Sequence, residues 1–173
     1  MKKRVFVPTV LTLLLVPALV SASGQNFTAH LSGDQEVPAR ETLATGHAIF
    51  HLSGDETALD YQLIVANIEN VVASHIHVGA SGVNGPVVAF LAGPFAPGGG
   101  RTDGVLAEGT ITAANLVGPL AGHPLSDLID AMRDGNTYVN VHTNDGVGAT
   151  NTGPGDFPGG EVRGQIEAHA PKP

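Results

Sequence analysis

The 173-residue chain has no cysteine and no tryptophan, and only 5% of its residues are aromatic. Without cysteine it can form no disulfide, no thiolate metal ligand, no cysteine nucleophile and no lipid anchor on a cysteine. Basic residues are also scarce, because eight Lys and Arg stand against sixteen Asp and Glu, which gives a formal net charge of −8. Since phosphate binding depends on Lys and Arg, this balance disfavours nucleic acids and anionic membrane surfaces as partners.

Long apolar runs are absent except at the N-terminus. There the basic residues 2–4 precede the apolar run 5–20, and Val20-Ser21-Ala22 offers small residues for cleavage. The run contains two prolines and is shorter than the roughly 20 residues of a spanning helix, although an uncleaved N-terminal anchor is the alternative. We therefore predict a signal peptide over 1–22, a single domain over 23–173, and a secreted, periplasmic or cell-surface location with no membrane contact after cleavage.

Beyond residue 22, the chain alternates apolar and polar side chains in short runs that are separated by Gly, Asp, Asn and Pro. This pattern is typical of an all-β fold, because strand side chains point to opposite faces in turn. We expect an antiparallel, Greek-key-like β-sandwich of about eight strands, which should cover residues 27–31, 48–52, 59–65, 71–78, 86–91, 105–112, 137–143 and 161–168.

One segment has helical spacing instead. Leu125, Leu128, Ile129 and Met132 recur at intervals of three and four, which predicts one short helix over 126–134. Ser126 is the expected N-cap and Gly135 the expected C′ residue. Two long loops are also expected, over 93–104 and 144–160. The second follows His142 directly and could roof a site that His142 helps to form.

Three of the eight histidines form the most informative pattern. In the strand 71–78, His75 and His77 are two residues apart, so their side chains share one face with Cα atoms roughly 6.5–7 Å apart. One metal ion can bridge that span, and His142 in the strand 137–143 could supply a third ligand. Imidazole suits copper or zinc. The alternative is that His75 and His77 bind loop carbonyls and fix the turn 79–85.

The remaining histidines suggest no site. His47 and His51 lie four residues apart on one strand, which separates them by roughly 13 Å, too far for one ion. We expect both on the surface, and His30, His123 and His169 show no partner in the sequence. Hydrolytic chemistry has no candidate either, because a Gly-x-Ser-x-Gly motif and a cysteine nucleophile are both absent. We name no catalytic residue and expect a binding protein more than an enzyme.

Five blocks of the sequence, in order, resemble the chordin-type (CHRD) domain family: 27–38 (FTAHLSGDQEVP), 45–50 (TGHAIF), 74–88 (SHIHVGASGVNGPVV), 138–143 (YVNVHT) and 160–166 (GEVRGQI). The resemblance covers about residues 27–167 and implies an all-β extracellular module. It implies no biochemical activity. The growth-factor-binding modules that accompany such domains in chordin are cysteine-rich, and nothing in this chain matches them.

The same histidines also resemble the copper ligands of Cu/Zn superoxide dismutase. That resemblance implies copper at His75, His77 and His142, with Arg163 as a guide for an anion. The chain departs from that family because no histidine lies between His77 and His123 to bridge to zinc, and the disulfide is impossible. The sequence therefore leaves three functions open: a metal-binding CHRD module, a copper-only dismutase-like redox enzyme, and an adhesion or matrix module without metal. It names no protein partner.

Overall fold

The computed structural model of the protein describes residues 25–169, so the predicted signal peptide lies outside the described residues. Nine strands form one nearly closed antiparallel sheet in the order β5-β4-β7-β8-β1-β2-β3-β6, with β9 paired to β1. The strands are β1 (Asn26–Ser32), β2 (Thr45–Leu52), β3 (Leu59–Glu69), β4 (Val71–Val78), β5 (Val87–Ala92), β6 (Arg101–Ile111), β7 (Thr137–Thr143), β8 (Val162–Gln165) and β9 (Glu167–His169).

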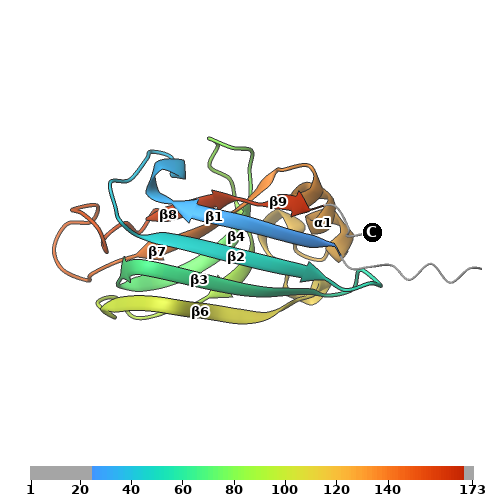
Figure 1. The fold of residues 1–173 in the computed structure, drawn as a ribbon, viewed down its shortest axis with the longest axis horizontal. Coiled ribbons are helices and arrows are strands. Elements are labelled where there is room, and N and C mark those ends of the chain that lie inside the picture. Colours follow the sequence, from blue (N-terminus) through green and yellow to red (C-terminus); the bar gives the residue numbers. More distant parts are fainter. Residues whose placement is uncertain (1–24, 170–173) are drawn as a thin grey trace, which may run out of the picture.

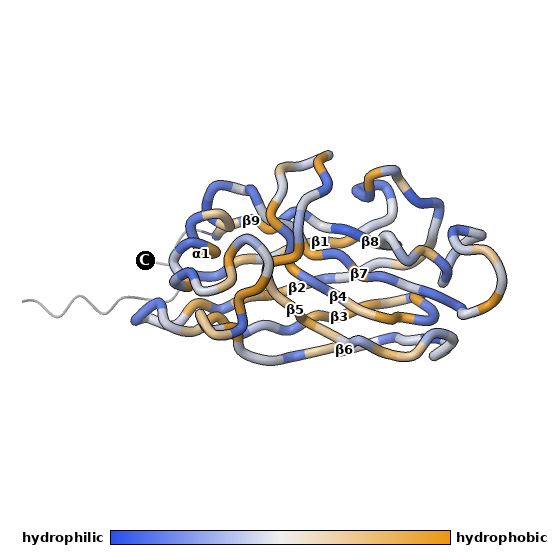
Figure 2. Tube along the Cα trace, turned by 180° about the vertical axis from the view of Figure 1, so that it is seen from behind, coloured by the Kyte–Doolittle hydropathy of each residue, from blue (hydrophilic) through white to orange (hydrophobic). Residues whose placement is uncertain are grey.

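The strands face each other in two layers. In Figure 1, β1, β2, β3 and β6 lie side by side in front, and β4 and β7 lie behind them. Figure 2 gives the opposite view, in which β5 lies beside β4. The core between the layers is built from the apolar residues of each alternating strand, such as Phe27, Phe50 and Leu63 in front and Ile76 and Val139 behind, all fully buried. The predicted all-β sandwich is confirmed.

One short helix covers an end of the sandwich. Helix α1 (Leu125–Arg133) buries Leu125, Leu128, Ile129 and Met132 in the core. Elsewhere the described chain has three short 3-10 segments, at Gly33–Gln35, Ala113–Asn115 and Gly118–Leu120. Gly135 has a φ of +68° and ends the helix as predicted, with its N–H on the Met132 carbonyl. Ser126 as N-cap is wrong, because the helix begins one residue earlier and Pro124 is the cap.

The predicted strand bounds differ from those in the structure in two places. The single expected strand over 161–168 is two strands, because Ile166 between them is fully buried and donates its N–H to the Thr137 carbonyl. Strand β6 also begins inside the expected loop 93–104. Its first residue, Arg101, pairs in register with Glu69 at the end of β3.

Strand β7 is buried on both of its faces. Val139 and Val141 face the core, whereas Tyr138, Asn140 and His142 alternate with them on the outer face. That outer face is covered by three loops, over 33–44, 79–86 and 144–161, which bond to Asn140, Tyr138 and His142 respectively. Side chains on the outer face of β4, β7 and β8 therefore lie in a second, polar interior between sheet and loops.

Candidate metal centre

His75, His77 and His142 come together on the outer face of β4 and β7. His75 and His77 flank the fully buried Ile76, and in the antiparallel register they pair with Asn140 and Tyr138 of β7. His142 lies two residues beyond Asn140 on the same face. One ligand atom from each histidine lies within 4.8 Å of those of the other two. The strand pairing, which the sequence did not reveal, thus makes one cluster of the three.

The hydrogen bonds of two rings fix which nitrogen is free. Nδ1 of His77 lies 2.9 Å from the Gly85 carbonyl, and Nδ1 of His142 lies 2.8 Å from the Pro158 carbonyl. A carbonyl only accepts, so each Nδ1 carries the proton and each Nε2 keeps a lone pair. Loop carbonyls therefore bind His77 and His142. For His77, this is the contact that the alternative interpretation of the sequence predicted. In both rings the Nε2 atom points away from the carbonyl that holds Nδ1.

The Nε2 atoms of His77 and His142 differ in their hydrogen-bond partners. Nε2 of His142 lies 3.1 Å from Nδ1 of His75. Nε2 of His77 is buried and has no hydrogen-bond partner among the described residues. One ion with Cu–N or Zn–N bonds of about 2.0–2.1 Å holds neighbouring nitrogens roughly 3–3.4 Å apart. In the metal-free protein the 3.1 Å contact is a hydrogen bond in which Nδ1–H of His75 donates to Nε2 of His142, because Nδ1 of His142 carries its own proton. The spacing suits two ligands of one ion once the His75 proton has moved to Nε2 of that ring, and the three rings, whose ligand atoms lie within 4.8 Å of one another, would then close on the ion.

All three rings are held neutral. Burial lowers the pKa of His75 to about 4, with further lowering by His142 and His77. Burial likewise lowers the pKa of His77, against the opposing effect of its bond to Gly85, and it lowers the pKa of His142. An uncharged imidazole keeps the lone pair that binds a metal. The cluster can therefore accept an ion at neutral pH without first releasing a proton to solvent.

Aromatic rings form the walls of the cluster. Tyr138 stacks on His77 with ring centroids 4.8 Å apart and an angle of 9° between the planes. Phe90 of β5 meets His75 edge-on at 4.9 Å and is itself 55% exposed. His77 is only 8% exposed, whereas His75 and His142 are half-buried. A small ligand would reach the cluster past His75 and His142 rather than past His77.

The family model for the CHRD domain matches residues 27–166, most of the chain. The chain belongs to the CHRD-domain family. No curated protein is significantly similar to it. The residues of this CHRD domain that the structure describes include no helix long and apolar enough to cross a membrane. The similarity of the histidines to Cu/Zn superoxide dismutase gains no support from these comparisons.

Arg163 of this CHRD domain lies beside the cluster but does not open to solvent. The side chain is 1% exposed, and its guanidinium donates to the carbonyls of Ala80 and Val83 and to Oδ1 of Asn84. Its Cζ lies 3.4 Å from the centroid of the Tyr138 ring. In this position it fixes the 80–84 loop and supports Tyr138, so a role as anion guide would require that loop to move.

Sequence reasoning missed a buried acid next to the cluster. Glu36 is 6% exposed, and Asn140 donates to its Oε1 at 2.7 Å. Burial raises the pKa of Glu36 to about 7, against the opposing charges of Arg163 and Arg40. The polar residues Tyr138, Asn140 and His142 alternate as they would on a solvent-facing strand, so the sequence contains no signal that loops cover this face.

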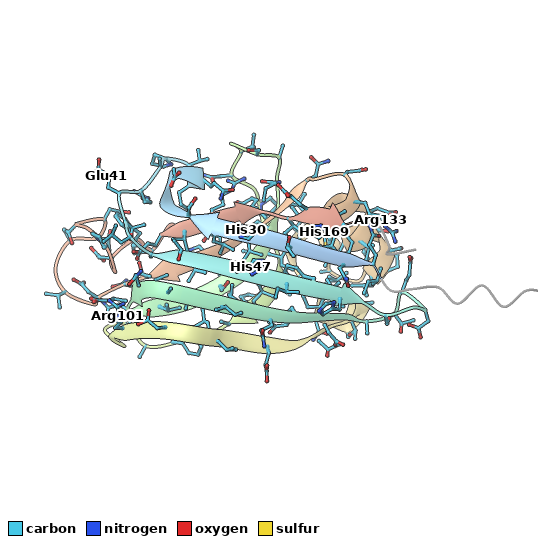
Figure 3. The ribbon with its side chains drawn as sticks, viewed as in Figure 1. His30, Glu41, His47, Arg101, Arg133 and His169 are labelled. Carbon is cyan, nitrogen blue, oxygen red and sulfur yellow. The ribbon has the colours of Figure 1, made fainter. Side chains whose placement is uncertain are left out.

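The other five histidines lie away from the cluster. As expected, His47 and His51 both lie at the surface: His51 is exposed, and His47, labelled in Figure 3, is half-buried on the outer face of the front layer. The structure supplies the partners that the sequence lacked: His47 for His30, Asp127 for His123 and Thr28 for His169. Glu161, which directly precedes β8, accepts hydrogen bonds from Thr42, Thr143 and the Gly155 amide.

Proposed function

We propose that this CHRD domain is an exported binding module that holds one copper or zinc ion through His75, His77 and His142. The observation that carries the proposal is Nε2 of His77, which is buried without a partner while Nδ1 of the same ring is fixed on Gly85. Such an atom costs free energy, because it has lost its bond to water and gained no other. An ion bound at this point would remove the cost.

The ligand set favours copper or zinc over other ions. Three neutral imidazoles contain no carboxylate, which calcium and magnesium require. The backbone bonds of His77 and His142 at Nδ1 are the second contacts that metal-binding histidines commonly make, and they orient each ring toward the ion. Three protein ligands leave a fourth position for water or a small ligand.

The proposed export rests on the amino-acid sequence of the N-terminus. The basic residues 2–4, the apolar run 5–20 and the small residues before position 23 lie outside the described residues. The extracellular setting implied by the CHRD resemblance supports the same location. An exported protein without disulfides gains from any ligand that stabilises its native state.

The test is to load the protein with copper or zinc, dialyse it against a weak chelator such as glycine, and measure the metal bound per chain. We expect close to one ion per chain, and loss of that ion in His77→Ala and in His142→Ala. His123→Ala is the matched control, because the His123 ring is exposed and within residues 25–169 bonds only to Asp127. Absence of retained metal, or equal retention by all variants, would overturn the proposal and leave a metal-free module.

Redox chemistry is the second candidate. It is favoured by the open fourth position together with the half-buried state of His75 and His142, which lets a small molecule approach the ion. The copper-loaded protein should then consume superoxide faster than free copper at the same concentration, and His142→Ala should abolish the difference. Retained copper without this activity would identify a binding module.

A further inference from the structure

A second pair of histidines lies on the opposite side of the sandwich. His30 of β1 and His47 of β2 are directly opposite each other in the antiparallel register. Their rings are parallel within 5°, with centroids 4.4 Å apart. Both are labelled in Figure 3, on neighbouring strands of the front layer. Because Ala29, Leu31 and Ala48 on either side of them face the core, both histidines face outward.

These two rings differ from the other surface histidines in their bonding. His51, His123 and His169 each have a ring nitrogen 2.7 Å from a partner, which is Asn26, Asp127 or Thr28 respectively. Among the described residues, no hydrogen bond involves a ring nitrogen of His30 or of His47. Their lone pairs are therefore available, and His30 is exposed to solvent.

We propose that His30 and His47 form a second, surface site for a divalent transition metal, with copper or zinc as the ion. Cβ atoms of directly opposed strand residues are about 4.5–5.5 Å apart, so two imidazoles can reach one ion from neighbouring strands. The nitrogens of adjacent ligands on one ion lie roughly 3 Å apart, and rotation of the two rings about their side-chain bonds brings them from parallel stacking to that spacing. Water completes the coordination shell.

The surroundings suit a weak, accessible site. Burial and the neighbouring His30 lower the pKa of His47, which keeps that ring neutral and able to bind. Neither ring has a backbone carbonyl to orient it, unlike His77 and His142. A site of two unoriented ligands binds an ion less tightly than one of three oriented ligands. The pair should therefore fill after the cluster on β4 and β7.

The two sites are independent, because they lie in different layers of the sandwich and share no residue. The proposal for His30 and His47 therefore stands or falls apart from the proposed function. The experiment is a copper titration of the full chain, without a polyhistidine tag, together with its retention on a column of immobilised Cu²⁺. We expect two classes of binding, of which the weaker belongs to the surface pair.

Variants separate the two classes. His30→Ala and His47→Ala should each weaken the second class by at least about tenfold and elute earlier from the column, while the first class stays unchanged. His142→Ala should show the reverse pattern in the titration. His51→Ala is the matched control, because it is a surface histidine on the same strand as His47 and its ring is bonded to Asn26.

Three results would overturn the proposal. The wild-type chain could show no second class of binding. His30→Ala and His47→Ala could both match the wild type in affinity and elution. His51→Ala could change both as much as they do, which would mean that surface histidines bind individually and not as a pair. Circular dichroism of each variant checks that the outward-facing substitutions leave the fold intact.

Discussion

At the scale of single residues, the ring of His77 is oriented by groups from three parts of the chain. The Gly85 carbonyl accepts from Nδ1, the Tyr138 ring stacks on the imidazole, and Arg163 in turn lies over Tyr138. These contacts hold the free Nε2 atom in one direction before any ion arrives. Such prior orientation favours binding, because little side-chain freedom is left to lose.

Glu36 predicts an unusual pH dependence of stability. Its pKa is raised to about 7 in the fold, from an ordinary value of 4.5, chiefly by burial. Between these values the unfolded chain loses the proton that the folded chain keeps, so the free energy of unfolding falls as pH rises from about 4.5 to 7. The linkage amounts to about 3 kcal/mol. We expect Glu36→Gln to lack this part of the slope in urea unfolding at pH 5, 6, 7 and 8.

The control for this measurement is Glu41→Gln. Glu41 is exposed, as Figure 3 shows at the edge of the molecule, so its replacement should keep the wild-type slope. Glutamine at position 36 can still accept from Asn140, because its Oε1 remains. Parallel pH curves for wild type and Glu36→Gln would show that burial does not hold a proton on this carboxyl.

At the scale of elements, the turn between β4 and β5 links the fold to the site. Gly85 accepts from His77 and donates its N–H to the Tyr138 hydroxyl at 3.1 Å. A Cβ at this position would overlap the Val78 carbonyl, so the turn must shift. We expect Gly85→Ala to cost about 1–3 kcal/mol of unfolding free energy and to weaken copper binding at least about tenfold, because the Gly85 carbonyl moves away from His77.

Gly99→Ala is the matched control, because a Cβ there meets no atom within 4 Å and the backbone is not left-handed. It should change the unfolding free energy by less than about 0.5 kcal/mol. Urea unfolding and equilibrium dialysis of copper measure both effects. Unchanged copper affinity in a Gly85→Ala protein that is clearly destabilised would mean that the turn supports the fold but does not orient His77.

Sequence periodicity predicted the elements better than their contacts. Alternation identified β3 and β7, and the spacing of Leu125 to Met132 identified α1, because these patterns are local. It could not predict that β7 pairs with β4, which brings His142 to His75 and His77, since pairing depends on the whole topology. For the same reason His30 had no visible partner in the sequence, although His47 lies directly across from it.

Sequence reasoning also could not predict which loops cover the outer face. The resemblance to superoxide dismutase implied that Arg163 guides an anion, but the loop 80–84 encloses its side chain. Glu36 lies in a segment with ordinary turn residues, and its burial follows from contact with Asn140, which is 104 positions away. Properties such as a raised pKa arise from these long-range contacts and leave no local signature.

At the scale of the whole molecule, the sandwich has two interiors of different chemistry. The apolar core between the layers stabilises the fold by burying residues such as Phe27 and Ile76. The second interior, between β4, β7, β8 and their loops, buries charged and polar groups that include Arg163, Glu36 and Asn140. Metal binding there would couple the loops 79–86 and 144–161 through His77 and His142, and so affect the stability of the whole domain.

One equivalent of copper should raise the unfolding temperature, because an ion that binds only the native state adds about 2.7 kcal/mol when free metal is one hundred times Kd. The lowered pKa values of the three histidines give this effect a defined pH range. Each native imidazole binds its proton more weakly than a free one, so protons compete with the ion only below the ordinary histidine pKa of about 6.5, and at His75 only as the pH approaches about 4. The stabilisation should therefore persist below pH 6.5, where an exposed histidine site would lose its ion, and decline as the pH falls toward 4.

The difference between loaded and metal-free protein at each pH is the quantity to compare, and it is measured in the Glu36→Gln background because a bound cation would itself change the pKa of the neighbouring Glu36. In the metal-free protein, the unfolded histidines take up protons that the native cluster refuses, so its stability falls as pH drops from about 6.5 toward 4. His142→Ala should show no copper stabilisation at any pH. Stabilisation that disappears already near pH 6.5 would mean that the ion sits on ordinary exposed histidines and not in the buried cluster.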